Sequence, residues 1–237
     1  MLELDGVAVR YGRTEAVADV SLHVDAGEVI GLIGPNGAGK STLLAAISGQ
    51  RRAARGTITF QGRAIDGETP ERLVRRGIAL VPEGRQIFAT LTVEENLRLP
   101  TFARRDVDAD ALIERELERF PILRTYLHQH AGRMSGGEQQ MLAISRALLC
   151  GPRLLMLDEP SLGLAPKMID AVFAALDSLR QEQVTVLLVE QNATRTVAFA
   201  DRSYVLVHGR VAAQGTREEL AGLEEVTSSY LGLEAGP

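Results

Sequence analysis

The sequence predicts an α/β protein whose core is a parallel sheet covered by helices. Beyond residue 150, short apolar runs alternate with helical stretches, which is the pattern of a parallel sheet whose strands are joined by helices. Earlier in the chain, the apolar run Val29–Ile33 leads through a glycine-rich loop into a second apolar stretch at residues 43–47. Such a strand–loop–helix unit is the other mark of this class.

The N-terminal part is predicted to consist of strands. Val20, Leu22 and Val24 alternate strictly with polar residues, and Leu2 to Val9 alternate roughly, so each stretch buries one face. Further strands are predicted at residues 29–33, 57–60 and 78–81.

The middle of the chain is predicted to be helical. Residues 106–120 are charged with apolar positions at helical spacing, and Pro121 breaks that helix. A second helix begins near Ser135, a good N-cap residue, and stops at Gly151 and Pro152. We expect this region to be an inserted subdomain rather than a separate domain.

The remainder returns to alternating strands and helices. The prediction is a strand at 154–157, a helix at 167–180, a strand at 185–189 and a helix at 193–200. A hairpin around Gly209 and one or two short helices over 217–231 follow.

Composition narrows the functional class. A net charge of −5 over 237 residues gives no footprint for nucleic acid, so no nucleic-acid partner is expected. The N-terminus carries acids and no signal-peptide pattern, and no apolar run is long enough to span a bilayer. Any membrane connection is therefore expected to go through a partner protein. The single cysteine, Cys150, is predicted to be a core residue and suits a reducing compartment.

The glycine-rich loop matches the phosphate-binding pattern G-x-x-x-x-G-K-[ST]. Glycines let backbone N–H groups converge on phosphate oxygens, and the start of the following helix adds its positive dipole end. Lys40 is expected to reach the β- and γ-phosphates, and the Ser41 hydroxyl to bind Mg²⁺. The residues expected to bind ATP here are Gly34, Pro35, Asn36, Gly37, Ala38, Gly39, Lys40, Ser41 and Thr42.

The choice of cation strengthens this assignment. Among 26 lysines and arginines, only Lys40 and Lys167 are lysines. A chain that otherwise uses arginine has a lysine where a phosphate cradle needs a compact charge on a flexible stem.

Two carboxylates follow the apolar strand at 154–157. Ligands of open α/β sheets bind beyond the carboxyl ends of the strands. Asp158 is therefore predicted to hold Mg²⁺, directly or through water, and Glu159 to activate the attacking water as a general base. A surface acid pair at a strand end is the structural alternative.

A second anion site is predicted at the start of the helix near Ser135. A hydroxyl, free N–H groups and a helix dipole converge in Ser135, Gly136, Gly137 and Glu138. One nucleotide site does not need two phosphate-binding helix starts. A dimer does, if each nucleotide lies between the phosphate loop of one chain and the Ser-Gly-Gly segment of the other.

The three motifs, in this order, resemble the nucleotide-binding subunit of ABC transporters over essentially the whole chain. The resemblance implies a P-loop NTPase (RecA-like) core, an N-terminal antiparallel β subdomain and an inserted helical subdomain. It implies one ABC ATPase domain over 1–237, with residues 1–90 and 151–237 forming the core and β subdomain and about 91–150 the helical part. It also implies a head-to-tail dimer that closes on ATP.

Further family positions carry over by resemblance. Tyr11 corresponds to an aromatic that stacks on adenine, although a strand-packing role is the alternative. The segment Ser161-Leu162-Gly163-Leu164 resembles the loop that crosses the dimer interface.

Two departures from the family pattern stand out. Glu83 aligns with the glutamine that links nucleotide and membrane subunit; it retains an oxygen ligand for metal, and Gln86 nearby is the alternative. Gln191 stands where the family has a catalytic switch histidine; it donates to a γ-phosphate but cannot become cationic. Lys40, Glu159 and Gln191 form the expected catalytic set.

The strings at 81–85, 92–97, 135–141 and 189–193 resemble the LivF-type ATPase of bacterial branched-chain amino acid importers, as does the ending Ser229-Tyr230-Leu231-Gly232. This implies a peripheral protein on the cytoplasmic face of the bacterial cell membrane. Its partners would be a second ATPase subunit, identical or homologous, and transmembrane permease subunits, with an extracytoplasmic solute-binding protein acting indirectly. A urea importer, a soluble ABC ATPase and a small-molecule kinase are the alternatives.

Overall fold

The computed structural model describes residues 1–104 and 107–221, which fold into two compact units. The first unit contains Met1–Leu73 and the described residues from Thr185 onward, and the second is Val74–Val184. The subdomain boundaries expected from the sequence, 90 and 151, stay a prediction. Asp106, the C-terminal residues from 222 on and the string at Ser229 lie outside the described residues.

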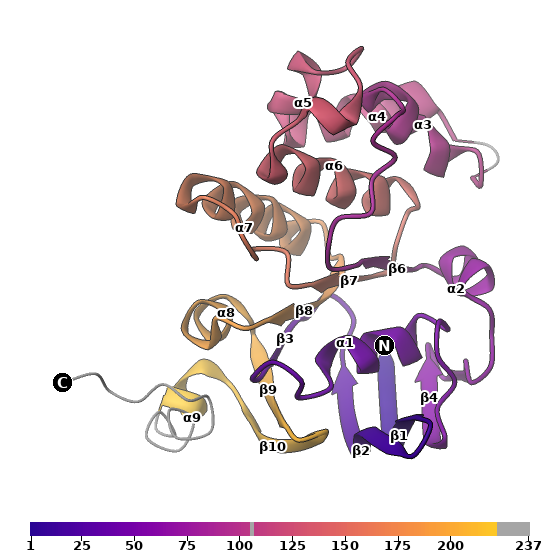
Figure 1. Ribbon diagram of the computed structural model, residues 1–237, viewed down its shortest axis with the longest axis vertical. Helices are drawn as coiled ribbons and strands as arrows, with labels where there is room; N and C mark the ends of the chain where they lie inside the picture. The colour runs from indigo at the N-terminus through magenta and orange to yellow at the C-terminus, as the bar shows by residue number, and fades with distance from the viewer. Residues whose placement is uncertain (105–106, 222–237) are drawn as a thin grey trace. The chain divides into compact units, whose positions relative to one another are not determined.

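An antiparallel sheet forms one part of the first unit. Its strands run in the order β2 (Thr14–Val24), β1 (Leu2–Tyr11), β4 (Arg55–Phe60) and β5 (Arg63–Ala64), and Figure 1 shows β2, β1 and β4 side by side. Alternate residues of β2 are buried from Val20 to Val24, because a pleated strand presents one face to the core. The expected N-terminal antiparallel sheet is confirmed.

The other strands of this unit surround β3 (Val29–Ile33), whose residues are all buried. β3 pairs in parallel with β8 (Thr185–Glu190) and β9 (Arg202–Val207), and β10 (Arg210–Gly215) pairs antiparallel with β9. The β9–β10 turn has His208 and Gly209 at φ 48° and 74°, so both adopt the left-handed conformation of a tight hairpin. The helices are α1 (Lys40–Ile47), α8 (Ala193–Phe199) and α9 (Arg217–Ala221), together with α2 (Pro70–Arg76), which crosses the boundary between the units.

A partly buried polar network fixes the entry into β3. The Tyr204 side chain is completely buried; its hydroxyl accepts from the His23 backbone N–H at 3.1 Å and donates to the His23 carbonyl at 3.2 Å. The guanidinium of Arg202 also donates to this hydroxyl and bonds both carboxylate oxygens of Glu28 at 3.1 Å. The network therefore joins the end of β2, the turn before β3 and strand β9.

We expect Tyr204→Phe to lower the free energy of unfolding by about 1–3 kcal/mol, because the His23 N–H and the Arg202 guanidinium each lose an acceptor. Urea unfolding followed by circular dichroism measures the change. Tyr126→Phe, the same change at a half-buried position, is the control and is expected to shift stability by less than about 0.5 kcal/mol. An unchanged unfolding midpoint for Tyr204→Phe would show that this hydroxyl does not stabilise the fold.

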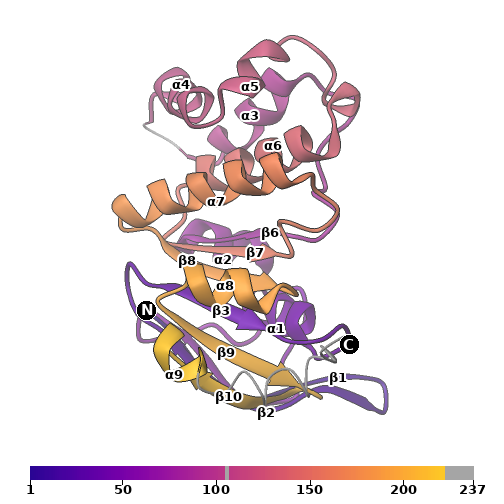
Figure 2. The same cartoon turned by 90° about the vertical axis from the view of Figure 1, so that its left-hand side faces the viewer.

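The second unit combines two strands with most of the helices. β6 (Ile78–Val81) pairs in parallel with β7 (Leu154–Asp158). Figure 2 shows the helices α3 (Val93–Thr101), α4 (Ala109–Arg119), α5 (Pro121–Thr125), α6 (Gly136–Leu149) and α7 (Pro166–Gln181), with a short 3-10 helix at Ala131–Arg133 before α6. The described residues contain no helix both long and apolar enough to cross a membrane.

Some expectations in this unit were wrong in detail. The helix expected from residue 106 begins at Ala109, because the Asp108 carboxylate caps it by accepting from the N–H groups of Asp110 and Ala111 at 3.1 Å. Pro121 does end α4, but it also begins α5, since the first turn of a helix tolerates proline. Cys150 is only half-buried at the end of α6, and burial raises the pKa of its thiol.

Candidate functional site

The phosphate loop has the geometry of an anion cradle. Gly39, the N-cap of α1, has φ 103°, and a Cβ added there would lie 2.5 Å from the Ala16 carbonyl oxygen, so only glycine fits. Among the described residues, no side chain caps α1 at this end. The start of a helix is where backbone N–H groups and the positive dipole end favour an anion, as the motif predicts for this loop.

Lys40 already occupies the loop from within. Its side chain is almost buried, with the residue 4% exposed, and its ammonium donates to the carbonyls of Gly34 at 2.8 Å and Pro35 at 3.3 Å. Asn36, Gly37 and Ser41 are exposed, so the rim of the loop is open to solvent. The loop is held from outside by the N–H of Gly209, which donates to the Ala38 carbonyl at 2.9 Å.

Gln191 and the phosphate loop follow neighbouring strands. β3 and β8 pair in parallel with Ile33 opposite Glu190, so the loop and Gln191 begin at the same edge of the sheet. Gln191 is exposed, whereas Glu190 is almost completely buried. Asn192 caps α8 by accepting from the Arg195 N–H at 3.1 Å, which fixes where the chain turns after Gln191.

The Asp-Glu pair ends β7 in the second unit. Asp158 is the last residue of the strand and is 7% exposed, and Glu159 follows it, half-buried. Glu159 has φ 47°, in the left-handed region that a residue other than glycine enters at a cost of about 1–3 kcal/mol. The turn is closed by the Leu162 N–H, which donates to the Glu159 carbonyl at 3.1 Å, and leaves Leu162 itself 49% exposed.

The expected second anion site is the start of α6. Ser135 is the N-cap, as expected, and its backbone N–H donates to the Glu138 carboxylate at 2.7 Å. Glu138, expected among the ATP-binding residues, therefore serves at least to cap this helix. Gly137 is packed against α7, since a Cβ there would lie 2.6 Å from the Cε of Met168.

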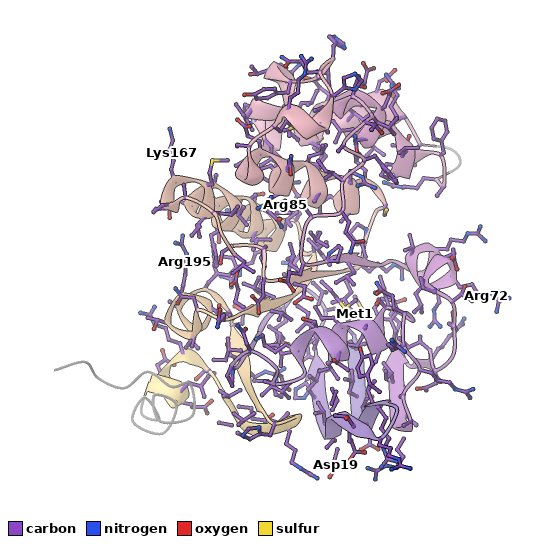
Figure 3. The ribbon with its side chains drawn as sticks, in the orientation of Figure 1. Met1, Asp19, Arg72, Arg85, Lys167 and Arg195 are labelled. Atoms are coloured by element: carbon purple, nitrogen blue, oxygen red, sulfur yellow. The ribbon has the colours of Figure 1, made fainter. Side chains whose placement is uncertain are left out.

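The loop of Glu83 and Gln86 is attached to α6. Arg85 lies at the start of this helix (Figure 3), so close that a Cβ on Gly136 would be 2.8 Å from its guanidinium. Farther along α6, Arg146 donates to the Gln86 carbonyl at 2.9 Å and stacks its guanidinium 4.6 Å from the centre of the Phe88 ring. Glu83 is exposed, and it follows β6 just as Asp158 ends the neighbouring strand β7.

Arg146 is a site residue that the sequence did not reveal. Burial lowers the pKa of its guanidinium, and its Nε has no hydrogen-bond partner among the described residues. On sequence it is one arginine in an otherwise apolar helical stretch, which usually indicates a solvent-facing position. Only the tertiary contact with Phe88 and Gln86 shows its role in positioning the loop.

The expected metal ligands have the right donor chemistry for Mg²⁺. Ser41, Asp158 and Glu83 offer hydroxyl and carboxylate oxygens, which this hard cation prefers. Across residues 1–104 and 107–221, no three His, Cys, Asp or Glu side chains are grouped so that they alone hold a metal ion.

The fold and these motifs define the class of protein to which the chain belongs. Residues 17–162 match the model of the ABC transporter family, which covers more than half of the chain, so this chain belongs to that family. It is an ATPase cassette that binds nucleotide, and the family expected from the three motifs is confirmed.

Individual relatives are similar to this chain over nearly its whole length. The high-affinity branched-chain amino acid transport ATP-binding protein BraG of Pseudomonas aeruginosa is 49% identical, over 98% of this chain and 100% of its own. The probable branched-chain amino acid transport ATP-binding protein LivF of Archaeoglobus fulgidus is 38% identical over 94% and 95%. A crystal structure of the ADP conformation of an ABC transporter cassette superimposes with a TM-score of 0.85 at 26% identity, covering 100% and 99%.

Proposed function

We propose that this chain is the ATP-hydrolysing subunit of an importer of branched-chain amino acids. The observation that carries the proposal is the 49% identity to BraG, which extends over nearly the full length of both chains. The solute is chosen by other subunits, so the chain contributes the energy of ATP and not the specificity. We propose one ABC ATPase domain, with the helical part at about residues 91–150.

The roles of the residues follow the chemistry of each motif. The loop amides of residues 34–42 and the Lys40 ammonium bind phosphate, and Tyr11 stacks on adenine. Glu159 removes a proton from the attacking water. The residue is half-buried, so fewer bulk water molecules compete for the hydrogen bond to the attacking water. Gln191 donates a hydrogen bond to the γ-phosphate.

Magnesium supplies charge neutralisation when it is bound with the nucleotide. Ser41 and Asp158 would hold it, and Glu83 is a further oxygen ligand, direct or through water. Asp158 is suited to this role because its carboxylate is nearly buried at a strand end, where the ion would compensate its charge.

The signature segment at Ser135, Gly136 and Gly137 is proposed to complete the site of a second ATPase subunit, identical or homologous. The starts of α1 and α6, each predicted from its motif to bind phosphate, support this arrangement. Permease subunits would dock on the helical part and the Glu83–Phe88 loop, placing the protein at the cytoplasmic face of the membrane. A solute-binding protein would act only through the permease.

Complementation tests the proposal. In a Pseudomonas aeruginosa strain lacking BraG, expression of this chain is expected to restore uptake of labelled leucine, whereas the Glu159→Gln variant restores none. Urea uptake is measured in parallel. If the wild-type chain hydrolyses ATP and co-purifies with the host permease subunits but leaves leucine uptake unrestored, the assignment of the solute is wrong.

A further inference from the structure

An arginine covers one face of the proposed adenine platform. Tyr11 ends β1 with 40% of its surface exposed, and the guanidinium of Arg51 lies 4.5 Å from the centre of its ring. This is the distance of a cation–π contact. A planar base that stacks on Tyr11 is therefore left with the opposite face of the ring.

Arg51 is itself fixed to the helix that follows the phosphate loop. Its backbone N–H donates to the Ala45 carbonyl of α1 at 2.9 Å, at the end of the helix opposite Lys40. Eight residues of α-helix span about 12 Å, so α1 separates the phosphate-binding end from the arginine by a fixed length.

The tip of the β1–β2 hairpin is bound to the same segment. Arg55 Nη2 lies 2.9 Å and Arg10 Nε 3.2 Å from the Glu15 carboxylate, and these contacts hold the pKa of Glu15 below its usual range. The Ala54 N–H donates to the Ala8 carbonyl at 2.7 Å. Backbone and side-chain contacts of Ala54 and Arg55, which follow Arg51 in the sequence, thus keep Tyr11 beside it.

We propose that Arg51 is a positioning residue for the nucleotide base. By stacking on the back of the Tyr11 ring, it holds the ring at a fixed distance from the phosphate loop, so that the base platform and the phosphate loop lie at opposite ends of α1. The inference rests on the proposed role of Tyr11 in ATP binding. Arg51 does not touch the nucleotide; it acts only through Tyr11.

A double-mutant cycle on ATP affinity tests the inference. Titration calorimetry with ATP in the presence of a chelator avoids turnover. Arg51→Ala is expected to raise the Kd for ATP about two- to fivefold, the range of an exposed cation–π contact. The same substitution in a Tyr11→Ala background is expected to have no further effect. Arg52→Ala removes the same charge from the exposed neighbouring position and is the matched control.

Each outcome of the double-mutant cycle either supports or overturns the role of Arg51. An equal loss of affinity in both backgrounds would show that Arg51 acts on the phosphates through its charge, and no loss in either would show that it does nothing; both overturn the inference. If Tyr11→Ala leaves the Kd unchanged, Tyr11 is not the base platform and the inference fails with it. The proposed transport function is untouched by these results, because it is judged by leucine uptake.

Discussion

Glu159→Gln is expected to slow ATP hydrolysis by about 10²–10⁴-fold while leaving ATP binding intact. General-base catalysis contributes this range, and an amide cannot accept the proton of the attacking water. The substitution preserves the shape of the side chain, so the strained turn at φ 47° is kept. Phosphate release at saturating ATP measures turnover, and equilibrium binding of ATP is measured on the same preparation.

Glu118→Gln is the matched control for this change. It makes the same chemical substitution on the exposed face of α4, in the same unit, and is expected to hydrolyse ATP at the wild-type rate. Turnover of Glu159→Gln within a few-fold of wild type would remove this carboxylate from the role of base.

The second large effect is expected at the start of α6. Ser135→Ala removes a hydroxyl proposed to bind the γ-phosphate of the partner's nucleotide, and the loss of one such donor costs about 10²–10³ in kcat. The Ser135 side chain is exposed, and the Glu138 carboxylate still accepts from the residue 135 backbone N–H, so α6 is expected to remain folded. Gly137→Asp is a poorer test, because any side chain there would overlap the side chain of Met168 on α7.

Mixing experiments show whether the site is shared. Lys40→Ala and Ser135→Ala are each expected to be inactive, but a head-to-tail dimer of one copy of each has one site free of both defects. Activity that reappears on mixing the two inactive variants supports a shared site in a homodimer. Wild-type activity of Ser135→Ala alone would contradict a role for this segment in hydrolysis.

Most of the elements that carry the motifs were predictable from the sequence. β3, β6 and the Ser135 cap of α6 lie where the apolar runs and the N-cap signal predicted them. Helix α3, which contains Pro100 near its end, was not among the predicted helices. Its start was visible in principle: Thr92 and Glu95 form a capping box.

The positioning residues were beyond sequence reasoning. Arg146 and Arg51 act through the rings of Phe88 and Tyr11, which are remote along the chain but lie 4.6 and 4.5 Å away in space. No period or motif relates the two members of such a pair, since the contact exists only once the elements have packed. By contrast, Lys40 and Glu159 belong to local patterns whose chemistry depends on neighbours in sequence.

The Lys40 ammonium has two ligands within its own loop, and a bound phosphate would compete with them. In the proposed role of Lys40 in phosphate binding, the carbonyls of Gly34 and Pro35 remain as ligands of the ammonium when the phosphate oxygens depart. Each binding event must in turn displace these internal ligands, which subtracts from the affinity gained. The proposed phosphate site is therefore expected to bind its ligand less tightly than a site whose lysine has no internal carbonyl ligands.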